Sequence, residues 1–280
     1  MKLRKKKAKK KKKKKRRMKN KNIGILIFVT VLSVLFWYLA DKWILSPTRL
    51  GDEQLWISLL AVFIFLASLL AISFLILNRQ VLKLFLIALV AIPFFIFFKF
   101  DLYYLLSVVL MFWFLVYATK LIKEEAVERT KINIRLILRR GLPPIFTGFF
   151  IMISFAYFLS PAVQSIAEQE KLPPTFNQAI KQVFGVMFGG ELEELTPAER
   201  EETESNFVGQ VVVEANEVIK PFFKYMPPVV AFGLFLVLQG LSFVFIWLAI
   251  GIGILAFSIL KKFSFFKITE AQVKSEVLEI

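Results

Sequence analysis

Six apolar stretches, each long enough to cross a bilayer, constrain this fold more than any other feature of the chain. They are residues 23–45, 54–77, 81–98, 102–122, 144–163 and 229–260. A transmembrane helix needs about 20 mainly apolar residues, and these stretches are continuous runs rather than patterns with a helical or strand period. The sequence therefore predicts an all-α, polytopic membrane bundle of about six transmembrane helices.

Composition supports a membrane protein and excludes several kinds of chemistry. Hydrophobic residues make up 57% of the chain, which is above the roughly 45–50% of soluble domains. The chain has no cysteine and no histidine, so it offers no thiolate nucleophile, imidazole base or zinc ligand set. We expect no cofactor, no metal site and no catalytic constellation.

The first 22 residues form a polybasic segment of 13 lysines and 3 arginines without an acidic residue. These cations equal the formal net charge of +16, because the other 21 basic residues match 21 acidic ones. We expect residues 1–22 to be a disordered cytoplasmic tail, because cytoplasmic loops are rich in lysine and arginine. The stretch at 23–45 exceeds the ~7–15 apolar residues of a cleaved signal, so it is interpreted as a retained first span.

The same charge rule orients the rest of the chain. Residues 120–140 carry seven cations and three acidic residues and are placed inside, whereas residues 164–228 carry five cations and eleven acidic residues and are placed outside. Lys261, Lys262 and Lys267 place the C-terminus inside, so both termini are expected in the cytoplasm, with the chain in the plasma (inner) membrane. The predicted parts are the tail 1–22, spans one to five at 23–163 with a cytoplasmic amphipathic segment at 120–143, an acidic cap at 164–228, a long last span at 229–260 and a C-terminal tail at 261–280.

The acidic cap is expected to be a short extracytoplasmic helical hairpin. Thr175 can cap a first helix that ends at Gly189-Gly190, and Thr196-Pro197-Ala198-Glu199 is a capping box that opens a second helix, which Pro221 ends. The apolar stripes of a cap this small are expected to pack on each other, on the bilayer or on another subunit. A protein partner or a second copy of the chain is thus an expected ligand of the cap.

Two prolines and two groups of glycines mark expected interruptions. Gly141 and Pro143-Pro144 are expected to stop the amphipathic segment before the fifth span. The last run would be about 48 Å long as one helix, against a bilayer core of about 30 Å. It is therefore either one tilted or kinked helix, or a helix broken near Gln239-Gly240 or Gly251-Ile252-Gly253.

The candidate polar site inside the membrane consists of Gln239, Gly240 and Ser242. It is the most polar point at mid-depth, because no ionisable residue lies near the middle of a span, and Lys83, near the start of its span, can reach the interface. These residues could line a pore, but an interhelical hydrogen bond beside a close glycine contact is favoured.

The polybasic tail offers a candidate surface for anionic lipid headgroups. Its representative contacts are Lys5, Lys6, Lys7, Arg16 and Arg17. Each cation near an anionic surface contributes about 1 kcal/mol. Nucleic acid is a less favoured partner, because lysines without interleaved aromatic residues supply charge and no base readout. A solvated arm that only sets topology is the remaining interpretation.

Asp52-Glu53, in the first outer loop, resembles the acidic pair of membrane glycosyltransferases that use lipid-linked sugars. The resemblance covers these two residues and implies a lipid-active enzyme. Asp52 fits equally well as the cap of the second helix.

Three functional hypotheses follow. The first is a non-catalytic membrane scaffold or assembly component, anchored by the basic tail and presenting the cap to a partner. The second is a channel or passive transporter with its pore near Gln239. The third is a lipid-active enzyme that uses Asp52 and Glu53.

Overall fold

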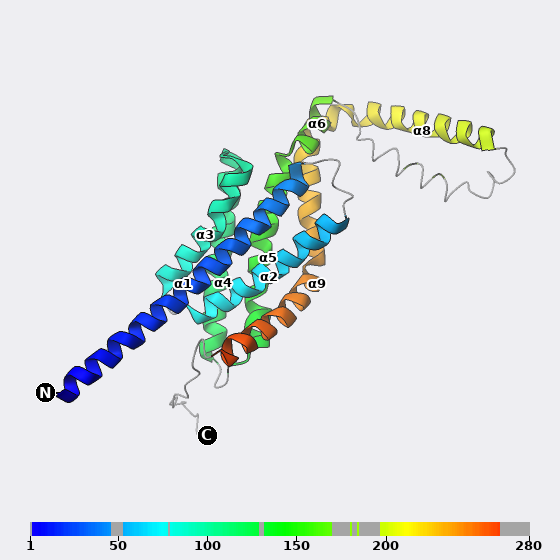
Figure 1. Ribbon diagram of the computed structural model, residues 1–280. Coiled ribbons are helices and arrows are strands. Elements are labelled where there is room, and N and C mark those ends of the chain that lie inside the picture. The colour runs from blue at the N-terminus through cyan, green and yellow to red at the C-terminus, as the bar shows by residue number, and fades with distance from the viewer. Residues whose placement is uncertain are drawn as a thin grey trace, which may run out of the picture. The chain divides into compact units, whose positions relative to one another are not determined.

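The computed structural model describes residues 2–45, 53–77, 79–128, 132–169, 180, 184 and 197–263, and these residues form helices and no strand. The helices are α1 (Lys2–Leu45), α2 (Glu53–Ile76), α3 (Gln80–Phe98), α4 (Leu102–Glu128), α5 (Ile134–Phe158), α6 (Pro161–Gln169), α8 (Pro197–Ile219), η3 (Lys220–Tyr225) and α9 (Met226–Lys262) (Figure 1). The fold is an all-α helical bundle, which confirms the fold class predicted from the sequence.

Six segments are long and apolar enough to cross a bilayer. They are Asn22–Leu45, Gln54–Ile76, Gln80–Phe98, Leu102–Glu128, Ile134–Phe158 and Phe222–Lys262. The chain is thus a multi-pass integral membrane protein. The hydropathy runs locate the start of the first four segments to within about one residue.

The chain divides into two compact units. Unit 1 comprises Met1–Ala156 and Phe235–Ile280, and unit 2 comprises Tyr157–Leu234. In unit 1, α1 packs against α2 and α3, and α4 packs against both of these helices. The helices lie side by side in Figure 1.

An aromatic cluster fills the interior of unit 1. Phe36 on α1 is 0% exposed, and its ring centroid lies 5.3 Å from that of Phe63 on α2 and 5.5 Å from that of Phe149 on α5. Trp37, next in sequence, lies 4.9 Å from Phe94 on α3. Edge-to-face and offset stacking at these separations adds about 0.5–1.5 kcal/mol per pair. The cluster therefore joins four helices through two consecutive residues of α1.

Two polar side chains of α1 bind a single backbone carbonyl of α3. The Ser33 hydroxyl donates to the carbonyl of Val90 at 2.9 Å, and the Trp37 indole N–H donates to the same oxygen at 3.1 Å. Val90 lies three residues before Pro93 and next to Leu89, whose carbonyl has no helical N–H donor because of the proline. The two hydrogen bonds therefore join α1 to α3 beside this interruption of the helical hydrogen bonds.

The amphipathic segment does not stop before the fifth span, and this corrects the prediction made from Gly141 and Pro143-Pro144. Helix α5 is continuous from Ile134 to Phe158, with both prolines inside it. The prolines remove two N–H donors, but Leu138, Leu142 and Phe146, on both sides of them, are fully or almost fully buried. Packing of this face outweighs the local preference to end the helix.

Two glycines allow α5 to approach its neighbours. A Cβ atom at Gly141 would overlap the Ile122 side chain of α4, and one at Gly253 of α9 would lie 2.6 Å from Cδ1 of Leu138. A larger residue at either position would force the facing side chain, Ile122 or Leu138, to move.

The first helix begins earlier than expected, and the last span takes one of the two forms that the sequence left open. Helix α1 begins at Lys2, whereas a disordered tail was expected over residues 1–22. Lysine and arginine are good helix formers, and no glycine or proline interrupts this segment. The last span is one continuous helix, α9, with no break at Gln239-Gly240 or at Gly251-Ile252-Gly253. The last predicted segment, 261–280, is described only as far as Phe263.

Unit 2 contains α6, α8 and η3, and η3 packs against both of the other helices. Helix α8 begins at Pro197 and ends at Ile219, before Pro221, as expected from the capping box. The ring of Phe184 lies 4.7 Å from that of Phe207 on α8. The other residues of the first expected cap helix, including Thr175 and Gly189-Gly190, lie outside the described residues, apart from Ile180.

We predict that Phe36→Ala lowers the free energy of unfolding by about 3–5 kcal/mol, because it leaves a cavity at the centre of the aromatic cluster. Unfolding in detergent followed by tryptophan fluorescence measures the change. Phe243→Ala is the matched control, because Phe243 on α9 is 63% exposed, and it should cost about 0.5 kcal/mol or less. Equal losses for the two variants would show that the cluster does not hold the bundle together.

Candidate functional site

The predicted polar site forms one hydrogen bond between helices. The Thr147 hydroxyl of α5 lies 3.4 Å from Oε1 of Gln239 on α9, and it lies 3.1 Å from the carbonyl of Pro143. Both Thr147 and Gln239 lie toward the outside of unit 1, and the Gln239 side chain is exposed. The contact links α5 to α9, and it is the hydrogen-bond part of the arrangement expected from the sequence, which also included a close glycine contact.

The neighbours of Gln239 do not extend this contact into a larger site. Gly240 is exposed, and a Cβ atom there would have no neighbour within 4 Å, so it makes no close helix contact. Ser242 is half-buried. The close glycine contact of α9 lies at Gly253 instead, beside Leu138. The glycines of Gly251-Ile252-Gly253 were a signal for this contact, but in the sequence they were interpreted as a possible break in the helix and not as a packing contact.

A charged cluster joins the C-terminal end of α4 to α5, and the sequence analysis missed it. Nη1 of Arg140 lies 2.9 Å from Oε2 of Glu125 and 3.2 Å from Oε2 of Glu128, and Nη2 lies 3.9 Å from Oε2 of Glu124. Lys120 lies 3.9 Å from Glu124 one turn earlier on α4. The sequence indicates this cluster through the spacing of Glu124, Glu125 and Glu128, which places the three carboxylates within about one helical turn.

Burial makes one of these ion pairs more important than the others. The carboxylate of Glu125 is 8% exposed, whereas the side chains of Glu124 and Glu128 are 36% and 60% exposed. A buried carboxylate without a partner is strongly unfavourable, while exposed pairs contribute little. The guanidinium of Arg140 can serve several carboxylates because it presents five N–H donors. The cluster therefore fixes α5 against α4 rather than offering a free acid or base.

An arginine of α5 also contacts α9 directly. The guanidinium of Arg135 lies 5.7 Å from the ring centroid of Trp247. Cation–aromatic contacts of this kind are favourable, and both arginine and tryptophan are common at the membrane interface.

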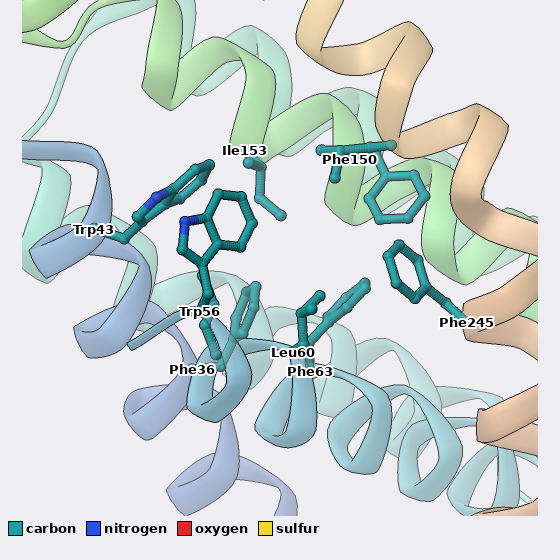
Figure 2. Close-up of a pocket in the computed structure, with 10 residues that line it drawn as sticks. Phe36, Trp43, Trp56, Leu60, Phe63, Phe150, Ile153 and Phe245 are labelled. Atoms are coloured by element: carbon teal, nitrogen blue, oxygen red, sulfur yellow. The ribbon is translucent and has the colours of Figure 1, made fainter. Parts of the chain in front are cut away.

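Unit 1 contains a cavity of about 20 Å³ that is lined only by apolar and aromatic side chains. Figure 2 shows Trp43 and Trp56 on one side of it, and Phe150 and Phe245 on another. The rings of Trp43 and Trp56 lie 4.4 Å apart. Sites for small molecules are usually about 300–1,000 Å³. This cavity is a packing defect of the aromatic cluster rather than a ligand site.

The remaining candidate residues lie at the edges of the described chain. Asp52 lies outside the described residues, and Glu53 is the first residue of α2. Lys5, Lys6, Lys7, Arg16 and Arg17 lie on the helical backbone of α1. Among the described residues, no group of acidic residues is arranged to hold a metal ion.

We predict that Arg140→Gln lowers the unfolding temperature more than Arg139→Gln does. The first substitution leaves the buried carboxylate of Glu125 without its 2.9 Å partner, whereas Arg139 is an exposed neighbour of the same charge. Adding Glu125→Gln to the Arg140→Gln variant should restore part of the loss, because it removes the buried carboxylate that Arg140 binds. Strictly additive effects in this double-mutant cycle would argue against the pair.

Comparison of the chain with protein families, curated proteins and solved structures finds no match in any of the three.

Proposed function

We propose that this multi-pass membrane protein is a non-catalytic scaffold or assembly component. Its basic tail would anchor it to anionic headgroups through residues such as Lys5, Lys6, Lys7, Arg16 and Arg17. Unit 2 would present a helical surface to a protein partner or to a second copy of the chain. The proposal includes the plasma (inner) membrane as the location and the cytoplasm as the compartment of both termini.

The observation that carries this proposal is the incomplete coverage of the apolar stripe of α8. Val208 is buried, Val211, Val212 and Ala215 are half-buried, and Val218, at the edge of the stripe, is 71% exposed. Helix α8 carries glutamates along its length, so it is too polar to lie among the bilayer-crossing helices. An apolar stripe left open on a polar helix is typical of a surface that binds another protein.

The packing of unit 1 supports a scaffold over a channel. Phe36, Phe63 and Phe149 fill the space between α1, α2 and α5. Gln239 faces away from this interior and is engaged by Thr147. A passage for ions needs polar groups along a hydrated path, and the described space between α1, α2 and α5 is filled by these aromatic rings instead.

We predict that Val218→Ser disrupts assembly of the full-length protein. Mass spectrometry of the detergent-solubilised protein would measure this as loss of a dimer or of a co-purifying partner. Val213→Ser is the matched control, because Val213 lies on the opposite face of α8 and is 59% exposed. The control should leave assembly intact, and neither variant should change the unfolding temperature. A wild-type chain that is monomeric and carries no partner would contradict the proposal.

We predict opposite labelling of the two sides of the membrane, and the absence of native cysteines makes the test direct. Phe100→Cys, between α3 and α4, and Ser205→Cys, on α8, should react with an impermeant maleimide in intact cells. Val127→Cys, near the end of α4, should react only after permeabilisation. All three positions are exposed. Equal labelling of positions 127 and 205 in intact cells would overturn the proposed orientation.

A further inference from the structure

The N-terminal end of α3 contains a buried lysine that the sequence analysis placed at the membrane interface. Lys83 is 6% exposed, so more than nine-tenths of the residue is covered. No hydrogen bond or ion pair joins its side chain to another described residue. A buried ammonium group without a counter-charge is strongly unfavourable.

The charged side chain that acts on Lys83 belongs to a second cation. Lys123 on α4 lies within electrostatic range of Lys83, and it too has no ion pair among the described residues. The Nε2 atom of Gln80 on α3 lies 3.5 Å from Oγ1 of Thr119 on α4, which fixes the register of the two antiparallel helices. Lys83 follows Gln80 by three residues and Lys123 follows Thr119 by four. Since helical side chains lean toward the N-terminus of their own helix, the two lysines lean toward each other across this contact.

The end of α3 adds further positive potential. Arg79 occupies the N-cap position, and no side chain caps the first N–H groups of the helix. A helix N-terminus carries about half a positive charge and favours anions, so Lys83 in the first turn is placed against the helix dipole. Two lysines thus lie beside an uncapped helix terminus, and the exposed Arg79 adds a further positive charge at this end of the hairpin.

The carboxylates at this end of the bundle are held elsewhere. Glu124, Glu125 and Glu128 of α4 are bound by Arg140 of α5. The positive end of the α3–α4 hairpin therefore needs an anion from outside the described chain.

We propose that Lys83, Lys123 and the N-terminus of α3 form a binding site for a phosphate group. Lys83 would contact the phosphate from the buried side and Lys123 from the exposed side, and the second N–H of the Gln80 amide is a further donor. The hairpin end where Lys123 and Arg79 are exposed is suited to the phosphate depth of a lipid bilayer. The phosphate belongs either to an anionic lipid headgroup or to a free anion, and both offer the same chemistry. This site is separate from the polybasic tail and does not depend on the scaffold function.

The test uses the full-length protein, purified in a zwitterionic detergent and freed of anionic lipid. Its unfolding temperature is measured during titration with phosphatidylglycerol in mixed micelles, and separately with inorganic phosphate against chloride of equal ionic strength. The variants are Lys83→Met and Lys123→Gln. Lys120→Gln is the control, because it removes the same charge from α4 at an exposed position paired with Glu124.

Without an anion, Lys83→Met should unfold at a higher temperature than the wild type, because it removes an uncompensated buried charge. Phosphatidylglycerol should raise the unfolding temperature of the wild type and of Lys120→Gln. It should leave Lys83→Met unchanged, and Lys123→Gln should need about fivefold more lipid for half of the effect. Lys123 is exposed, so the Lys123→Gln result does not depend on how a substitution in the core affects folding.

The two titrations distinguish the sources of the phosphate. A response to inorganic phosphate that Lys83→Met abolishes assigns the site to a free anion, and a response to the lipid alone assigns it to a headgroup. The proposal is overturned if neither anion stabilises the wild type, or if Lys83→Met and Lys123→Gln respond as the wild type does. It is also overturned if replacing Lys5, Lys6, Lys7, Arg16 and Arg17 by glutamine abolishes the response, because the anion would then bind to the tail.

Discussion

Hydrocarbon offers no water to replace a missing hydrogen bond, and this constraint explains most polar contacts between the helices. The carbonyl of Val90 near Pro93 accepts hydrogen bonds from Ser33 and Trp37. The Ser68 hydroxyl of α2 lies 2.9 Å from the carbonyl of Ala249 on α9. Each of these side chains reaches a backbone oxygen of another helix. The few polar side chains inside the bundle thus connect helices that are otherwise joined by ring packing.

The number of spans and the fold class are predictable because hydropathy is a local property. A run of about 20 apolar residues has one low-energy arrangement in a bilayer, whatever surrounds it. The point at which α5 begins does not depend on local sequence alone. Pro143 and Pro144 favour a helix end, but Leu142 and Phe146 are fully buried beside them. Only the neighbouring helices reveal how much contact would be lost if the helix stopped there, so the sequence predicted the wrong start for this element.

The candidate site was predictable to a smaller extent. The sequence identified Gln239 as a polar residue that needs a partner in the membrane, but it could not name Thr147, which is 92 residues away. It also could not separate Gly240, which has no close neighbour, from Gly253, which is packed against Leu138. Whether a glycine takes part in a helix contact depends on which face of the helix is turned toward its neighbours. The sequence of an almost uniformly apolar helix such as α9 gives little indication of that face.

The charges at the end of α4 show why opposite charges of one bundle can fail to neutralise each other. Lys123 and Glu125 are two residues apart and therefore lie about 200° apart around the helix axis. Gly141 lets α5 approach α4 at Ile122, and this places Arg140 beside the face that carries Glu125. Thr119, four residues before Lys123, contacts α3 on the other side. The body of α4 thus separates an anionic cluster, which has its own arginine, from a cationic group that includes a buried lysine. Rotation of α4 about its axis, which would bring its carboxylates closer to the buried lysine, would break the contact between Gly141 and Ile122. The bundle can retain both sets only if each is compensated on its own side.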